Sequence, residues 1–174
     1  MAKNSRRPAG SRLLAGLHQR FAKEALSHPA PEDVLNSLRQ DVHFGLLALQ
    51  AQADGSDMRD IDEHTWAKIA KVANMVQLAT DYQADVYDDA ECRILETGCR
   101  WMQDIANRAH AGHGWHATTR ELAGVTRLVV LISDTLDRFT IYALTCGWES
   151  MNIIIQRTRA QNGGLARCVV VDRA

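Results

Sequence analysis

The sequence is poor in aromatic side chains and in proline, and the shortage of aromatics limits the kind of core that it can build. Phenylalanine, tyrosine and tryptophan make up 6% of the 174 residues, and only three prolines occur. Aliphatic side chains must therefore fill most of the interior, so we expect a core of Leu, Ile, Val and Ala. A chain of this length can bury such a core in one domain and is too short to predict two.

Sequence signatures of the common catalytic and metal sites are also missing. There is no C-x-x-C pair, no G-x-S-x-G, no phosphate-binding glycine loop, no H-E-x-x-H and no EF-hand loop. Three of the four scattered cysteines fall in helical patterns, where a free cysteine usually acts as a small buried hydrophobe. These cysteines are Cys92, Cys99, Cys146 and Cys168. We therefore expect a protein that is not an enzyme and that binds no cofactor.

Long apolar runs are absent as well. No run approaches the length of a membrane-spanning helix, and the apolar stretch 13–17 is too short for the core of a signal peptide. These absences predict a soluble, cytoplasmic protein that keeps its thiols reduced and makes no membrane contact.

Charge is nearly balanced over the chain but is unevenly distributed. The formal net charge is −1, from 20 basic and 21 acidic residues. Residues 1–30 hold six basic residues and one acidic residue, a net charge of +5, which leaves 14 basic against 20 acidic residues and a net charge of −6 for the remainder. Residues 1–10 show no hydrophobic periodicity, so we predict a disordered basic arm there. Arg6 and Arg7 in this arm, and Arg12 just after it, are the candidate phosphate-binding side chains.

What the sequence does contain is a helical apolar pattern, clearest between Thr118 and Cys146. Eight apolar residues recur there at alternating spacings of three and four, which puts them on one stripe of a helix. They are Leu122, Val125, Val129, Ile132, Leu136, Phe139, Ala143 and Cys146. Thr118 and Glu121 match a T-x-x-E capping box, and we predict that the central helix of a bundle begins there. Leu128 and Leu131 widen the stripe beyond what short neighbours must cover, so we also expect a homodimer.

Helical patterns precede this segment as well. We predict a short helix from residue 11 that ends before Pro29, a helix from Pro31 to about residue 53, a helix from 63 (capped by Asp62) to about 87, and a helix from about 89 to 109. A polar loop at 54–60 and a glycine-containing connection at 111–116 join these elements.

The C-terminal segment 148–174 has two interpretations. If Gly147 ends the central helix, residues 152–157 and 167–172 become the strands of a hairpin. If Gly147 lies inside the helix, the helix runs to about Gln161. We favour the continued helix. The predicted fold is therefore an all-α bundle of four to five helices around a long central helix at about 118–160, forming a single domain over 11–174.

Three histidines in the glycine-containing connection are the candidate metal ligands. His110, His113 and His116 form H-x-x-H-x-x-H, and imidazole is a common ligand of zinc, nickel and copper. No cysteine or carboxylate with ligand spacing lies in the loop, and histidines beside helix ends more often serve as solvated caps. We therefore favour a structural or interface role over a metal site.

An acidic block and one tryptophan are the candidate partner-binding residues. The block is predicted to place Asp81, Asp85 and Asp88 on one helical face, with no basic residue among them. A solvated face is its simplest interpretation, and a surface that docks on a basic partner is the functional one. Trp101 lies off the best inner stripe, and exposed tryptophans often anchor interfaces, although a position in the core is an equal alternative. The candidate contact residues are Asp81, Asp85, Asp88, Asp89, Glu91 and Trp101.

Three stretches carry a resemblance to a known class of protein: the basic leader ending in Arg6-Arg7-Pro8, the helix start Pro31-Glu32-Asp33, and HTWAKIAKVANMVQLA at 64–79. In these stretches the chain resembles small all-helical proteins of proteobacterial phages and mobile elements, of the anti-defence or regulatory type. The resemblance implies a setting of phage–host conflict, in which stoichiometric binders are commoner than catalysts.

The predicted function is a non-enzymatic protein–protein interaction module. The resemblance implies an anti-CRISPR-like inhibitor that binds a host defence complex. The alternative is a helical transcriptional regulator that holds nucleic acid with its basic arm. We favour a protein partner, because the remainder of the chain, at −6, would repel a phosphate backbone.

Overall fold

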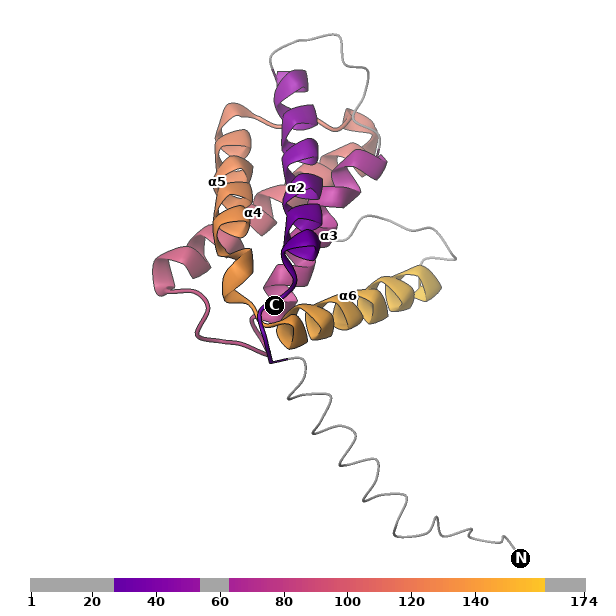
Figure 1. Cartoon of the computed structure of the whole chain (residues 1–174). Coiled ribbons are helices and arrows are strands. Elements are labelled where there is room, and N and C mark those ends of the chain that lie inside the picture. Colours follow the sequence, from indigo (N-terminus) through magenta and orange to yellow (C-terminus); the bar gives the residue numbers. More distant parts are fainter. Residues whose placement is uncertain (1–26, 54–62, 162–174) are drawn as a thin grey trace, which may run out of the picture.

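The computed structural model describes residues 27–53 and 63–161, most of which are helical (Figure 1). The helices are α2 (Glu32–Ala53), α3 (Glu63–Ala79), α4 (Asp89–Arg108), α5 (Thr119–Thr135) and α6 (Ile141–Gln161). A π-helical turn, η1 (Ala109–His113), follows α4, and a 3-10 turn, η2 (Leu136–Arg138), follows α5. Within these ranges the only β-type pairing is an isolated antiparallel bridge between Pro29 and Thr140. The predicted all-α helical bundle is confirmed.

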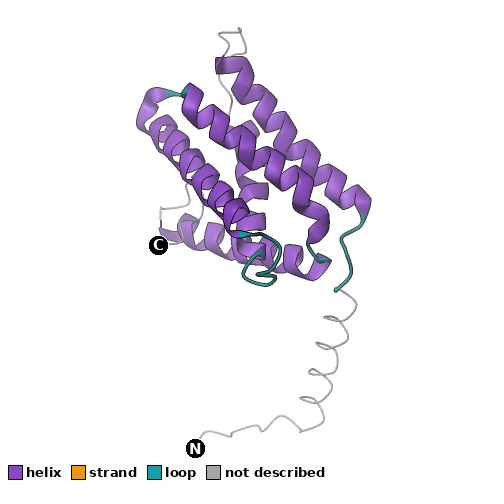
Figure 2. Cartoon of the chain, turned by 90° about the vertical axis from the view of Figure 1, so that its left-hand side faces the viewer, coloured by secondary structure: helices purple, strands orange, loops and turns teal. Residues whose placement is uncertain are grey.

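The helices form a bundle with one helix laid across its end. Helix α5 packs between α4 and α2, α2 packs between α5 and α3, and α6 packs against α3. Figure 1 shows α2, α3 and α5 running along one another, while α6 crosses beneath them. Figure 2 shows the same crossing from the side. The loops that join α3 to α4 and α5 to α6 therefore meet at the end of the bundle that α6 covers.

Helix α3 provides the centre of the core. Every residue from 72 to 79 is buried, including the polar side chains of Asn74 and Gln77. The predicted inner-face residues Trp66, Ile69 and Val76 are all at most 1% exposed. Because α3 contacts α2, α4, α5 and α6, it is the element around which the other helices pack. The sequence pattern had favoured the segment after Thr118 for that position.

The prediction of one long helix at about 118–160 is wrong, because the chain breaks between α5 and α6. Residues 136–138 form η2, and Phe139 is extended, with φ −82° and ψ 139°. Helix α6 then starts at Ile141, where the hydroxyl of Thr140 accepts a hydrogen bond from the backbone N–H of Ala143 at 3.2 Å. Leu136 and Phe139 are still buried, because the tighter turn and the extended residue bring both back to the core. The apolar spacing therefore continued across a break in the helix.

Helix α6 continues through Gly147 to Gln161, so the favoured interpretation of residues 148–161 is confirmed and 152–157 is helix rather than strand. The other strand of the rejected hairpin, 167–172, lies outside the described residues. A Cβ at Gly147 would collide with the carbonyl oxygen of Met75 and come within 2.9 Å of the backbone nitrogen of Ala79. Glycine is therefore what lets α6 cross α3 at backbone contact distance.

The predicted helix starts are confirmed where the structure describes them. Helix α2 begins at Glu32, directly after Pro31. At α5 the capping box is present: the Glu121 N–H donates to the Thr118 hydroxyl at 3.3 Å, and the Thr118 N–H donates to the Glu121 carboxylate at 2.8 Å. Helix α4 begins at Asp89 with Asp88 as its N-cap.

The predicted end of the helix from 63 to about 87 is wrong, because α3 stops at Ala79. The hydroxyl of Thr80 donates to the carbonyl of Gln77 at 2.7 Å in the turn that follows. Residues 80–88 then form a loop held by the buried side chains of Val86 and Tyr87. Asp81, Asp85 and Asp88 therefore do not share a helical face.

Several predictions fall outside the described residues. They are the basic arm 1–10, the short helix from residue 11, the polar loop 54–60 and the Asp62 cap. Within the described ranges, none of the helices combines the length and the apolar character that crossing a membrane would require.

Candidate protein-binding surfaces

The outer face of α2 presents two large apolar side chains to solvent. Phe44 is 62% exposed and Leu47 is 61% exposed, one helical turn apart. The buried stripe of the same helix, Leu35, Val42, Leu46 and Leu49, occupies the opposite face. We call Phe44 and Leu47 the α2 patch. Single exposed apolar residues are ordinary, but two neighbours on one turn form a surface that a partner can cover.

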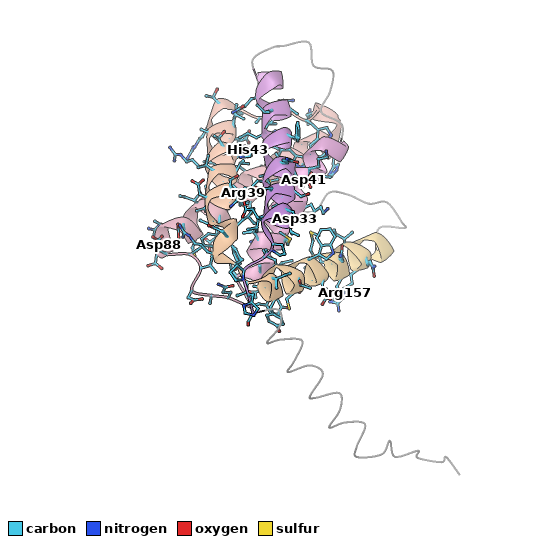
Figure 3. The ribbon with its side chains drawn as sticks, in the orientation of Figure 1. Asp33, Arg39, Asp41, His43, Asp88 and Arg157 are labelled. Carbon is cyan, nitrogen blue, oxygen red and sulfur yellow. The ribbon has the colours of Figure 1, made fainter. Side chains whose placement is uncertain are left out.

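Polar contacts to α5 fix the helix that carries this patch. The Arg39 Nε donates to the carbonyl of Ser133 at 3.0 Å, and the Arg39 guanidinium pairs with Glu32 at 2.9 Å. His43 Nε2 lies 3.2 Å from the Ser133 hydroxyl, in hydrogen-bond contact. Figure 3 shows Arg39 and His43 on the side of α2 next to α5. The α2 patch is thus held on a rigid element rather than on a loop.

The acidic residues predicted to bind a partner divide into two groups. Asp81, Asp85 and Asp89 are exposed, two of them in the loop before α4 and one in the first turn of that helix. Asp88 and Glu91 instead form the capping box of α4: Asp88 accepts from the Glu91 N–H at 2.8 Å, and Glu91 accepts from the Asp88 N–H at 3.1 Å. These two carboxylates therefore begin a helix, although Asp88 is itself exposed, and Asp81, Asp85 and Asp89 are surface charges outside the capping box.

The loop that carries the acids is also tied to the corner between α5 and α6. Glu91 pairs with Arg138 at 2.9 Å. The amide of Gln83 donates to the carbonyl of Arg138 at 2.8 Å and accepts from the N–H of Thr140 at 2.9 Å. One glutamine side chain therefore satisfies two backbone groups where the helix is broken.

Trp101 has a packing contact that accounts for its position. Its ring lies against Gly124 of α5, where an added Cβ would collide with the indole. The side chain is half-buried, so part of it stays open to solvent. Glycine at 124 lets the two helices approach each other over this ring. Trp101 lies twelve residues after Asp89 on the same helix, about 18 Å along its axis, so the two do not form one cluster.

The loop histidines do not converge. His110, His113 and His116 are all exposed, and the structure brings together no group of three or more potential metal ligands in the residues it describes. His110 packs edge-on against Trp115, with ring centroids 5.5 Å apart. Trp115 in turn lies 5.5 Å from the buried Trp66. Contacts between these rings thus anchor the loop to the core.

The most strongly held ion pair joins the end of α4 to the start of α5. The Arg108 guanidinium donates to both carboxylate oxygens of Glu121, at 2.7 and 2.8 Å. Burial alone would raise the pKa of Glu121, but the hydrogen bonds from Arg108 and Thr118 outweigh it and lower that pKa below its ordinary value. The same pairing raises the pKa of Arg108. This bidentate pair stabilises the turn between the two helices.

Two tyrosines near the corner have raised pKa values for different reasons. Burial raises the pKa of Tyr87 to about 12, and its hydroxyl lies 3.0 Å from that of Thr135 at the end of α5. A hydrogen bond with Cys146 is the main cause that raises the pKa of Tyr142. Both phenols are therefore protonated near neutral pH, and their arrangement is structural.

The homodimer was expected because Leu128 and Leu131 would be left uncovered, and that reason fails. Leu128 is fully buried and Leu131 is 7% exposed within the single chain.

The three basic candidates for phosphate contact, Arg6, Arg7 and Arg12, lie outside the described residues.

The residues predicted from the sequence to bind a partner did not include the α2 patch, although a signal for it was present. The stripe Leu35, Val42 and Leu46 fixes which face of the helix is buried. With a rotation of about 100° per residue, Phe44 and Leu47 fall on the opposite face. Apolar residues out of phase with the core stripe are the pattern that identifies them.

Comparison with known proteins yields no relative for this chain. No protein-family model matches it, no curated protein matches it, and no solved structure matches it.

Proposed function

We propose that this protein is a non-catalytic interaction module that binds another protein through the outer face of α2. The observation that supports this is the exposure of Phe44 and Leu47 on one turn of a rigid helix, opposite its buried stripe. A helix that presents apolar anchors three residues apart fits an apolar groove on a partner.

The energetics favour this surface over the exposed acids. Complete burial of a Phe or Leu side chain contributes roughly 1.5–3 kcal/mol, whereas exposed ion pairs contribute about 0–1 kcal/mol. The contacts of Arg39 and His43 with Ser133 already order α2, so binding need not order it again. Phe44 and Leu47 would supply the affinity, and the acids would supply steering and orientation.

We also propose that the partner is a host protein complex that this chain blocks by stoichiometric binding, in the cytoplasm. The resemblance to small helical phage proteins supports that context. The sequence between 31 and 174, at −6, favours a partner with a basic rim around its groove.

Replacement of both patch residues with alanine tests the proposal. A partner would be captured from host lysate in parallel with and without nuclease. The partner that resists nuclease would be purified and titrated with the parent and with Phe44→Ala/Leu47→Ala. We expect the double variant to weaken binding by at least about 100-fold, equivalent to about 2.7 kcal/mol, because two anchors lose most of their buried surface. The thermal midpoint should stay unchanged, because both residues are exposed.

Val130→Ala is the matched control, because Val130 is an exposed apolar residue, 48% accessible, on the outer face of α5. Its affinity should stay close to that of the parent. Equal binding by the parent and the double variant would overturn the α2 surface. Loss of every partner on nuclease treatment would instead favour the regulator that binds nucleic acid.

A further inference from the structure

The second half of α6 stays apolar, but it lies at the edge of the core. Met151 is the last buried side chain of α6 among those described, and none of residues 152–157 is buried. This stretch contains three consecutive isoleucines, of which Ile153 is 50% exposed and Ile154 and Ile155 are half-buried. Figure 1 shows this half of the helix extending beyond α3. Ile154 and Ile155 pack against the core, so the projecting half is accessible to another molecule on its outer face, which carries Ile153.

The outer face of this helix carries a short pattern of charge, apolar residue and opposite charge. Glu149, Ile153 and Arg157 follow one another at steps of four, and all three are exposed. Figure 3 shows Arg157 on the projecting half of α6. Among the described residues, neither Glu149 nor Arg157 belongs to a salt bridge. The two charges lie about 12 Å apart along the helix axis, so they cannot pair with each other in one chain.

This pattern is complementary to itself when two copies of the helix run antiparallel. If a two-fold axis passes beside Ile153, a residue four positions before it faces the residue four positions after it on the other copy. Glu149 of each chain then meets Arg157 of the other, and the two Ile153 side chains meet at the axis. Such a contact uses the same patch on both subunits, as two-fold dimers do.

We propose that the outer face of α6 is a self-association surface, on which a second copy of this chain packs its own α6 antiparallel about Ile153. A parallel arrangement would place like charges together, so the antiparallel one is selected. An unrelated partner would not require the two charges to be placed symmetrically about an apolar residue. The contact is independent of the α2 patch, which lies on a different helix.

The size of the contact sets its expected strength. One helix face buries less than the roughly 800 Å² per partner of a standard stable interface. Burial of the two Ile153 side chains provides the attraction, and the two exposed ion pairs fix the orientation more than the affinity. We therefore expect a weak dimer that forms with rising protein concentration and weakens at high salt.

Charge exchange tests this surface without removing any apolar contact. The dimer dissociation constant of the full chain would be measured by analytical ultracentrifugation for the parent, Glu149→Arg, Arg157→Glu and the double exchange. Each single variant places two pairs of like charges together and should raise the constant at least about tenfold. The double exchange restores opposite charges and should return the constant to near the parental value. Ile153→Asp should give a monomer, and at a concentration at which the parent is also monomeric its thermal midpoint should equal that of the parent.

Three results would overturn the inference. One is a parent chain that stays monomeric at every accessible concentration. Another is a double exchange no better than the single variants, because the charges would then not face each other. The third is a lower thermal midpoint for Ile153→Asp at a concentration at which the parent is also monomeric, which would mean that the chain covers this face itself. Because the partner titration of the α2 patch variants is measured separately, failure of one surface is distinguishable from failure of the other.

Discussion

The carboxylate of Glu121 has two roles: it completes the capping box of α5, and it pairs with Arg108 at the end of α4. Because the pairing lowers its pKa below the ordinary 4.5, the ion pair stabilises the fold fully above about pH 4.5, and that stabilisation is lost as the pH falls through the lowered pKa. We predict that Glu121→Gln costs about 1–3 kcal/mol at neutral pH, since it removes hydrogen bonds to charged groups.

Thermal midpoints of the parent and Glu121→Gln, followed from neutral to acid pH, check this. The difference between them should shrink as the solution becomes acidic. A difference that stays constant with pH would mean that the charge on Glu121 is not what stabilises the turn.

Gly147 is the residue whose missing side chain sets the distance between α6 and α3. In an isolated helix, Gly147→Ala would be favourable by about 1 kcal/mol. Here the new methyl group meets the backbone at Met75 and Ala79, which cannot rotate away as a side chain can. Overpacking of this kind costs typically about 1–3 kcal/mol, so we predict a net loss of stability.

Chemical denaturation measures this loss. Gln156→Ala, on the exposed face of the same helix, is the control and should stay within about 0.5 kcal/mol of the parent. A Gly147→Ala variant more stable than the parent would show that α6 can move away from α3 at little cost.

At the scale of the element, the acidic residues at the start of α4 have two different roles. Asp88 caps the helix, whereas Asp85 is a surface charge. Asp88→Ala removes the side chain that accepts from the N–H groups of Ala90 and Glu91, and should cost about 0.5–2 kcal/mol. Asp85→Ala should have almost no effect on stability, because Asp85 is exposed in the loop. The two free energies of unfolding, measured side by side, test this assignment; equal values would contradict it.

Helix starts were predictable from the sequence because their chemistry is local. Pro31 before Glu32, and Thr118 with Glu121, each satisfy backbone groups within one turn. The ends of α3 and α5 were not predictable, because groups distant in the sequence hold the chain beyond them. Gln83 bonds the backbone of Arg138 and Thr140, and Tyr87 contacts Thr135. A one-dimensional pattern contains neither contact.

The candidate surfaces were predicted less well than the fold. The spacing of apolar residues along a helix identifies its buried face. An exposed apolar residue is recognised only because it falls on a different face from that stripe. Phe44 was out of phase and could have been found. The exposure of Ile153 depends on where α6 crosses α3, which the sequence pattern does not specify. The acidic block was predicted to lie on a helix that runs to about residue 87, but that helix ends at Ala79.

At the scale of the whole molecule, the net negative charge after residue 30 predicts that exposed acidic residues accelerate association with a basic partner. Asp85→Lys/Asp89→Lys keeps the capping box intact, because Asp88 and Glu91 are unchanged. If the captured partner is basic around its groove, this variant should associate several-fold more slowly and dissociate at the parental rate.

Surface plasmon resonance at low and high salt checks this expectation. The difference in association rate should fall as salt rises, because screening weakens interactions between exposed charges. An unchanged association rate at low salt would remove the exposed acids from recognition, while the α2 patch would still be tested by its own variants.

The corner between α5 and α6 also has a consequence for the order in which the chain folds. The N–H of Ile141 donates to the carbonyl of His28 at 2.8 Å, and Pro29 bridges to Thr140, so the corner joins residues separated by most of the described chain. The α4–α5 hairpin, by contrast, closes over a short turn, and short loops close at a lower entropic cost than long ones. We infer that α4 and α5 pair early and that the corner closes last. Changes at the corner should then accelerate unfolding and leave the folding rate almost unaltered.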